Sequence, residues 1–239
     1  MEFDPTLGEA HISMALAYHE HYWDWEKAEE EFKVGLELSP NYATGHQWYG
    51  EFLFRMRRFE EGMKEIRIGR ELDPLSMIIH IVEAWGYVVS GDIEKGIEVI
   101  QNVVDFYPES PTAQFQAYRY NRTAGNDEVA FKSLFRGLDL IDASTEEVSK
   151  YKIAYKTEGW RGVSLLNLER NLEDGRPTNI AIDYIRLGEF EKAIDWLETG
   201  FEERDFAMTW INSNPVYQTA ELRQNKRFQV ILKKMNFPD

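Results

Sequence analysis

The five histidines are the residues of this chain best suited to bind a metal ion or to transfer protons. His46 and His80 lie 34 residues apart, a spacing that favours a repeated packing position over a pair of ligands. His19 and His21 are two residues apart and would point to different sides of a helix. There is no His-Glu-x-x-His run, and we expect the isolated His11 to be solvated. The histidine pattern therefore predicts no metal site.

Carboxylates could act as a general acid and base, and the chain has 42 acidic residues. The acidic runs at residues 29–31 and 202–203 fall on amphipathic helices, where such side chains usually face solvent. Acid–base catalysis needs a desolvated carboxyl group, and no pair is marked as one. There is no Gly-x-Ser-x-Gly run, no phosphate-binding glycine loop and no cysteine. We therefore expect no catalysis and no cofactor.

Composition narrows the classes of partner. The chain has 239 residues and a net charge of −15, which disfavours nucleic acid and anionic lipid as partners. The most apolar stretch, residues 77–89, contains His80 and Glu83 and is shorter than the ~20 residues of a membrane span. The N-terminal residues do not have the pattern of a signal peptide. These observations favour a protein of the cytoplasm.

Prolines and helix-packing residues recur along the chain with a period of 34 residues. Pro40, Pro74 and Pro108 keep this step, and Pro5 lies 35 residues before Pro40. A small residue and, four positions later, a large apolar one keep it too: Ala28, Gly62, Gly96 and Ala130, followed by Phe32, Ile66, Ile100 and Leu134. Self-similarity at this period predicts a stack of helix–turn–helix units, each of which buries its apolar side against the next.

The second unit shows how one repeat is built. Its two helices are predicted at residues 42–56 and 59–72, with Arg57 and Arg58 in the turn and Pro74 ending the second helix. Gly62 and Gly69 lie on the buried face of that helix, where their small size would let a neighbouring helix approach closely. In the first unit, one extra residue around positions 19–22 accounts for the 35-residue step.

The period divides the chain into segments. We expect the end of a preceding repeat (1–8), four in-register units (9–142), an irregular helical hairpin (143–176), another unit (177–207) and C-terminal capping helices (208–239). The irregular hairpin would have helices near 146–157 and 160–172. Residues 3–5 read like a repeat end without a preceding capping helix, so we expect a fragment of a longer protein. A short tail that happens to look like a repeat end is the alternative.

Several of the repeated residues resemble the tetratricopeptide repeat (TPR), which has 34 residues, a tyrosine late in its first helix and a closing proline. The matching residues are Ala28, Phe32, Tyr49, Gly50, Tyr87 and, in a later unit, Tyr184, Gly188, Ala193, Leu197 and Gly200. The resemblance covers about residues 9–142 and 177–204. It implies an all-α TPR superhelix, an α–α solenoid of about six helical hairpins with a C-terminal helical cap.

A closer resemblance is carried by residues 23–25, 41–49 and 72–76 and by the ending around Asn214 and Pro215. These stretches look like the TPR arrays at the C-termini of bacterial multidomain regulators, where a winged-helix, nucleotide-cyclase or protein-kinase domain precedes the array. The chain departs from that group by carrying Asn214 where an aspartate is usual. None of the effector domains is in this sequence, so the resemblance implies a signalling context and no effector activity.

The TPR resemblance also implies a binding surface, because the first helix of each unit lines the concave face of such arrays. Projected onto this chain, the rule selects Gln47, Trp48, Glu51, Phe54 and Arg55 in the second unit, Ile81, Val82, Trp85 and Val89 in the third, and Phe115, Gln116, Arg119 and Arg122 in the fourth. Aromatic and arginine side chains are enriched at binding hot spots. The surface would suit a peptide that carries some acidic residues. Alternatively, Trp48 and Trp85 pack between helices.

We therefore expect a non-catalytic protein–protein interaction or regulatory sensor module that holds a peptide or partner protein in its concave groove. Some TPR domains clamp a C-terminal carboxylate with Lys, Asn and Arg, but Ser13, Ala17, Gln47, Ile81 and Gln116 stand at the corresponding positions. Two alternatives remain open. One is a self-association module that forms a homodimer, and the other is a small-ligand sensor of a larger signalling protein.

Overall fold

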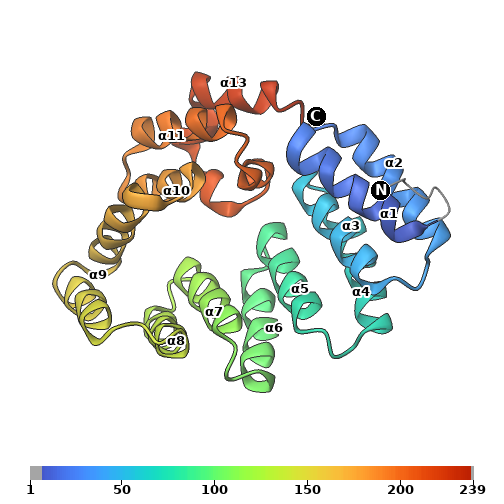
Figure 1. The fold of residues 1–239 in the computed structure, drawn as a ribbon. Helices are drawn as coiled ribbons and strands as arrows, with labels where there is room; N and C mark the ends of the chain where they lie inside the picture. The colour runs from blue at the N-terminus through green and yellow to red at the C-terminus, as the bar shows by residue number, and fades with distance from the viewer. Residues whose placement is uncertain (1–6, 238–239) are drawn as a thin grey trace. The chain divides into compact units, whose positions relative to one another are not determined.

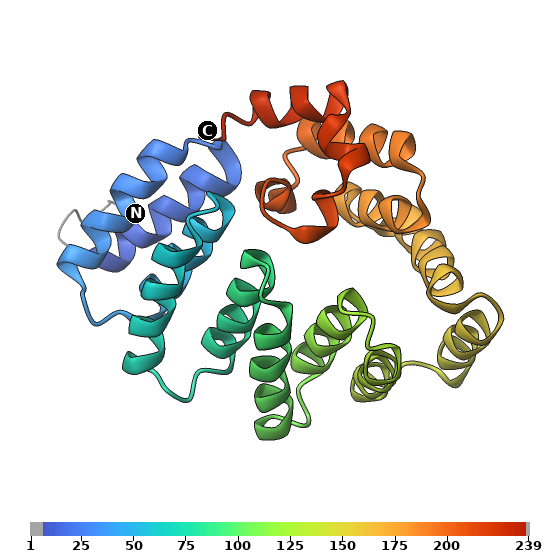
Figure 2. The same cartoon turned by 180° about the vertical axis from the view of Figure 1, so that it is seen from behind.

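The computed structural model describes residues 7–237, which form helices and turns and contain no strand (Figures 1 and 2). The all-α prediction is confirmed for this part of the chain. Two compact units divide it, Met1–Asp142 (unit 1) and Ala143–Asp239 (unit 2). The repeat-end pattern at residues 3–5, and with it the start of the 35-residue step, lies outside the described residues.

Unit 1 is a row of helical hairpins, each made of a first and a second helix. The pairs are α1 (Gly8–Ala17) with α2 (Trp25–Leu38), α3 (Ala43–Arg55) with α4 (Phe59–Leu72), α5 (Met77–Ser90) with α6 (Ile93–Phe106), and α7 (Pro111–Thr123) with α8 (Asp127–Leu140). Each first helix packs on its own second helix and on the first helix of the next hairpin. Each second helix also packs on the following first helix, so the apolar sides are buried in sequence order.

The helices of unit 1 begin and end where short polar residues and glycines favour it. The carboxylates of Asp24 and Asp92 accept hydrogen bonds from the third residue that follows each, over 3.2 and 3.1 Å, and cap α2 and α6. Gly91 and Gly125 end the first helices α5 and α7 with φ values of 98° and 78°, a left-handed conformation that suits glycine.

The extra residue predicted in the first unit takes the form of a π-helix. Tyr18–Tyr22 (η1) continues α1 with this wider turn, which is how an α-helix accommodates one added residue. The chain then reverses at Trp23, where φ is 55° and the side chain is buried. The position of the extra residue, inferred from the 35-residue step, is therefore confirmed.

Glycines bring the two helices of the second hairpin into close contact. A Cβ atom on Gly62 would lie 2.6 Å from the ring of Phe54 and 2.9 Å from the carbonyl oxygen of Gly50. A Cβ on Gly69 would lie 3.1 Å from the carbonyl oxygen of Ala43. Both glycines therefore serve the close approach that the sequence predicts for them.

Unit 2 is less regular than unit 1. Its elements are α9 (Thr145–Asp174), α10 (Pro177–Leu187), α11 (Phe190–Glu202), the 3₁₀ turns η2 (Phe206–Trp210) and η3 (Pro215–Tyr217), α12 (Ala220–Gln224) and α13 (Lys226–Lys234). The helical run of α9 is broken at Gly159, whose φ of 59° and ψ of −143° divide it into two helices. The second of these helices is followed by the α10–α11 hairpin.

A buried carboxylate ties the start of α10 to the segment after α11. One oxygen of Asp205 accepts hydrogen bonds from the backbone N–H of Thr178 (3.1 Å) and from its hydroxyl group (2.5 Å). The other oxygen accepts one from the N–H of Ala207 (3.0 Å), which begins η2. Asp205 and Thr178 are both buried, so this polar clasp is shielded from water.

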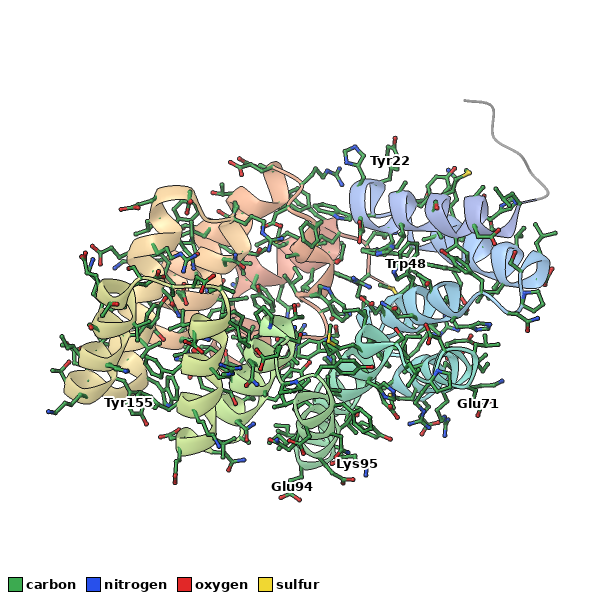
Figure 3. The ribbon with its side chains drawn as sticks, turned by 60° about the horizontal axis from the view of Figure 1, so that its bottom comes forward. Tyr22, Trp48, Glu71, Glu94, Lys95 and Tyr155 are labelled. Carbon is green, nitrogen blue, oxygen red and sulfur yellow. The ribbon has the colours of Figure 1, made fainter. Side chains whose placement is uncertain are left out.

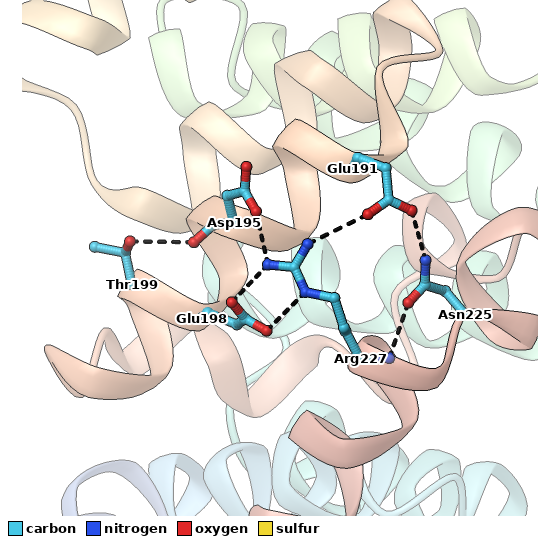
Figure 4. Close-up of polar contacts among 6 residues, drawn as sticks. All are labelled: Glu191, Asp195, Glu198, Thr199, Asn225 and Arg227. Atoms are coloured by element: carbon cyan, nitrogen blue, oxygen red, sulfur yellow. Dashed lines mark hydrogen bonds and ion pairs between the residues drawn. The ribbon is translucent and has the colours of Figure 1, made fainter.

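The last helix, α13, is held on α11 by apolar and ionic contacts. Phe228 and Ile231 are buried. The guanidinium group of Arg227 lies among three carboxylates of α11, with distances of 2.6 Å to Asp195, 2.7 Å to Glu198 and 3.2 Å to Glu191 (Figure 4). These carboxylates are exposed, so the burial of the apolar side chains contributes most of the stability of this contact.

Candidate binding site

The first helices α5 and α7 of unit 1 share an aromatic and polar cluster. The rings of Trp85 (α5) and Tyr120 (α7) stack with their centroids 5.9 Å apart, and the guanidinium carbon of Arg119 lies 5.8 Å from the centre of Trp85. Arg119 also donates a hydrogen bond to the side-chain oxygen of Gln116 (3.3 Å). Burial raises the pKa of Tyr120, so its hydroxyl group stays protonated. The predicted Trp85, Gln116 and Arg119 thus lie together.

A chain of polar contacts runs along α3. Gln47 donates a hydrogen bond to Glu51 (3.0 Å), and the other carboxylate oxygen of Glu51 lies 3.6 Å from the guanidinium group of Arg55. These residues are four apart and lie on one side of the helix. Arg55 is only 5 % exposed, and its burial lowers its pKa, against the attraction of Glu51 and Glu20. Of the three residues Gln47, Glu51 and Arg55, only Glu51 is partly exposed to solvent.

Three of the predicted contact residues, Gln47, Phe54 and Arg55, are buried, which corrects the sequence-based expectation. Phe54 has no exposed surface, because its ring fills the space left by Gly62 in α4 and Gly86 in α5. Phe54 is therefore a core residue and cannot contact a partner directly. Arg55 is buried as well, so it cannot contact a partner directly. It lies beside the carboxylate of Glu51, which is partly exposed.

The other predicted residues differ in how they are placed. Trp48 on α3 is half-buried (Figure 3), as are Phe115 and Arg122 on α7. The ring of Phe115 lies against Gly137 of α8, within its own hairpin, and Arg122 donates a hydrogen bond to the hydroxyl group of Tyr118 (2.9 Å). Three apolar positions on α5 are buried: Ile81, Val82 and Val89.

The sequence reasoning missed Tyr120, which is 2 % exposed and lies against Trp85. The repeat period could not identify it, because the equivalent positions one and two units earlier hold Gly86 and Phe52. The only hint in the sequence was that Tyr120 is an aromatic residue directly after the predicted Arg119.

The histidines at the repeated position have a structural role. The ring Nε2 of His46 and of His80 lies 2.9 Å from the carbonyl oxygen of Pro40 and of Pro74, six residues earlier. One repeat further on, Gln114 donates a hydrogen bond from Nε2 to the carbonyl oxygen of Pro108 (3.4 Å). This position therefore closes the turn between units, and the packing interpretation of His46 and His80 is confirmed.

The surroundings of His46 favour its charged form. Burial alone would lower its pKa, but the hydrogen bonds with the Glu65 carboxylate (2.7 Å) and the Pro40 carbonyl raise it. Since a carbonyl can only accept, Nε2 carries a proton, and a second proton on Nδ1 satisfies Glu65.

His11 and His19 are less accessible than the sequence suggests. The ring of His11 lies 2.5 Å from a carboxylate oxygen of Glu31, so the expectation that His11 is solvated is wrong. His19 is completely buried in the π-helix, and burial together with nearby Arg55 lowers its pKa well below the ordinary value. In residues 7–237, no three His, Asp or Glu side chains are placed to hold a metal ion. Over the same range, no helix is both long and apolar enough to cross a bilayer.

Unit 2 contains a pocket of about 430 Å³ between the two halves of α9. Both of its basic side chains are paired with carboxylates of the pocket: Lys150 with Glu146 (2.8 Å) and Arg170 with Glu147 (3.2 Å). The hydroxyl group of Tyr151 donates a hydrogen bond to Asn167 (2.7 Å). The pocket therefore offers no unpaired buried group that would select a ligand.

No protein-family model matches the sequence, and no curated protein matches it. Solved structures do resemble the fold. Yeast Tom70 is 15% identical over 97% of this chain and 50% of that chain, with a TM-score of 0.56. TTC0263, a thermophilic TPR protein of Thermus thermophilus, is 13% identical over 95% of this chain and 99% of that chain, with a TM-score of 0.51.

PilW, a widely conserved type IV pilus biogenesis factor, is 12% identical over 94% of this chain and 98% of that chain, with a TM-score of 0.51. At such low identity these similarities show the fold alone. Together with the hairpins described above, they confirm the predicted all-α helical-repeat solenoid of TPR type.

Proposed function

We propose that this chain is a non-catalytic interaction module that binds a peptide segment of a partner protein on the first-helix face of unit 1. We define this face by Trp48 and Glu51 of α3, Trp85 of α5, and Gln116, Arg119 and Arg122 of α7. The observation that carries the proposal is the cluster in which Arg119 lies over Trp85, whose ring stacks on Tyr120. It joins two successive repeats, and aromatic and arginine side chains are the types that dominate binding energy at interfaces.

The charges of the face favour a peptide that carries acidic residues toward α7 and a hydrogen-bond donor toward α3. Arg119 and Arg122 are half-buried, so a carboxylate that approaches them would meet a partly desolvated positive charge. On α3, Glu51 already accepts a hydrogen bond from Gln47 and would accept another from a partner. A peptide is a suitable ligand because an extended chain can contact equivalent positions in successive repeats.

The test is a selection of peptides from a random displayed library on the immobilised chain. The dissociation constants of the enriched peptides are then measured by fluorescence anisotropy. The double variant Trp48→Ala/Arg119→Glu should bind these peptides at least about tenfold more weakly, because a hot-spot substitution typically costs more than 1.4 kcal/mol. Circular dichroism should show unchanged helicity.

A matched control is Tyr22→Ala/Arg67→Glu, which also removes one aromatic ring and reverses one positive charge. Tyr22 is 63 % exposed at the end of the π-helix and Arg67 is exposed on α4 (Figure 3 labels Tyr22). This control should bind like the unchanged chain. Equal binding by both double variants would refute the proposed face. Light scattering across a dilution series distinguishes this role from self-association, which requires a dimer that dissociates.

The proposal extends to a regulatory role in a larger bacterial signalling protein of the cytoplasm. It is supported by the resemblance of residues 23–25, 41–49 and 72–76 to the arrays of multidomain regulators. The peptide-binding face would then report the presence of a partner to an effector domain. Sequencing of the reading frame upstream of Met1 tests this part, since a frame without an effector domain would refute it.

A further inference from the structure

A second row of side chains follows the repeat period in unit 1, at the C-terminal ends of the second helices. The last residue of each of these helices is large and apolar: Leu38, Leu72, Phe106 and Leu140. The first three are 46 %, 38 % and 79 % exposed. In the turns that follow α4 and α8, Leu75 and Ile141 are 76 % and 47 % exposed. We call the five exposed residues the repeat-end edge: Leu38, Leu72, Leu75, Phe106 and Ile141.

Contacts between hairpins link the second, third and fourth hairpins along this edge. The hydroxyl group of Tyr107, next to Phe106, donates a hydrogen bond to the carbonyl oxygen of Leu75 (2.6 Å). Arg136 of α8 bonds both to Glu109, in the turn after α6 (2.7 Å), and to Asp139 (2.6 Å). The ends of these three hairpins therefore adjoin one another. Exposed apolar side chains that adjoin in this way typically mark an interaction surface.

The charges along the repeat-end edge are all of one sign. Residues 37–44, 71–78, 105–112 and 139–144 contain no lysine or arginine. They contain seven acidic residues: Glu37, Glu71, Asp73, Asp105, Glu109, Asp139 and Asp142. Glu71 projects outward at the end of α4 (Figure 3). The adjacent Arg70 and Arg136 are both bonded to carboxylates, Arg70 to Glu83 over 2.6 Å.

We propose that the repeat-end edge binds an amphipathic helix of a partner protein, rich in lysine or arginine. An apolar row flanked by carboxylates is complementary to a helix whose apolar stripe is flanked by positive charges. Successive hairpins of unit 1 pack on one another in sequence order, so the apolar residues of the edge recur from hairpin to hairpin. A helix with one apolar stripe could contact several of them along its length.

The same charges disfavour other occupants. A second copy would bring an identical acidic edge, and anionic lipid would be repelled in the same way. The chain does contain a basic amphipathic helix, α13, with Lys226, Lys233 and Lys234. The apolar side of α13 is already buried in unit 2 through Phe228 and Ile231, so it cannot also occupy the edge of another copy.

The test uses a labelled model helix of about 18 residues, made of leucine and lysine in a heptad pattern, titrated into the full chain. We expect binding that weakens with added salt. The variant Leu75→Ser/Phe106→Ser should raise the Kd about tenfold, which corresponds to about 1.4 kcal/mol. Both side chains are exposed, so the thermal melting of the variant should match that of the unchanged chain. Glu71→Gln/Asp105→Asn should raise the Kd and reduce its dependence on salt.

The matched control is Ile153→Ser/Val230→Ser, which removes apolar side chains of unit 2 that are 62 % and 50 % exposed. It should leave the Kd unchanged, as should Trp48→Ala/Arg119→Glu on the first-helix face. Equal effects of the edge and control variants, or equal binding of a leucine–glutamate helix, would overturn the proposal. A dimer in sedimentation that Leu75→Ser/Phe106→Ser dissociates would assign the edge to a second copy and overturn it as well.

Discussion

Unit 1 and unit 2 are both built from helical hairpins, but they are held together by different kinds of contact. In unit 1 the same contacts return with the period, such as the bond from His46, His80 or Gln114 to the proline carbonyl. In unit 2 the contacts around Asp205 and Arg227 each occur once in the described chain. A repeat distributes its stability over equivalent contacts, whereas the irregular segments of unit 2 are held by contacts that do not recur.

The largest effect is expected where the repeated contact leaves no space. Gly62→Val would place a side chain against the ring of Phe54 and the backbone of Gly50, and should lower the free energy of unfolding by about 3 kcal/mol. Urea denaturation measures this loss in the free energy of unfolding. Gly125→Asn is the control, because Gly125 has nothing within 4 Å and Asn tolerates its left-handed conformation. Equal losses would show that close helix approach is not the reason for glycine at position 62.

In unit 2, Asp205→Ala would leave the N–H and hydroxyl groups of Thr178 buried without their acceptor. We expect a loss of about 2 kcal/mol in the free energy of unfolding. Asp195→Ala, which removes one of the three exposed carboxylates around Arg227, should change little. Urea denaturation measures both losses. A larger loss for Asp195→Ala than for Asp205→Ala would mean that the ionic contacts of Arg227 stabilise unit 2 more than the buried hydrogen bonds of Asp205.

The hydrogen bond to the proline carbonyl can be tested by replacing His80 with the residue found at the equivalent position of the next repeat. His80→Leu removes the donor to the Pro74 carbonyl and should cost about 1 kcal/mol. His80→Gln should be nearly neutral, because Gln114 makes the same bond one repeat later. If thermal melting shows equal losses for both variants, the hydrogen bond is not what this position contributes.

The smallest effect concerns pH. The pKa of His46 is raised above its unfolded value of about 6.5, so its contribution is complete below about pH 6.5 and is lost as pH rises through the folded pKa. His46→Gln should therefore lower the free energy of unfolding more at pH 6 than at pH 8. The pKa of buried His19 is lowered, so His19 acts oppositely and stability decreases as pH falls below about 6.5. NMR titration of the two rings should give pKa values on opposite sides of 6.5.

The sequence predicts the features that recur with the 34-residue period, and it predicts few of the contacts that occur only once. The period located the hairpins, the close contacts of Gly62 and Gly69, and the extra residue that became the π-helix. It misplaced Phe54, because part of the space that buries this ring comes from Gly86, a residue of the next hairpin outside the repeated small positions. The clasp between Asp205 and Thr178 joins residues 27 apart in an irregular segment and has no periodic signal.

The central claim is that a peptide binds the first-helix face of unit 1, and amide NMR of the full chain with a selected peptide tests it most directly. The account predicts that the shifts change at Glu51, Trp85, Gln116 and Arg119, and at the indole N–H signals of Trp48 and Trp85. Changes confined to unit 2 or to the second helices of unit 1, with these signals unmoved, would contradict it.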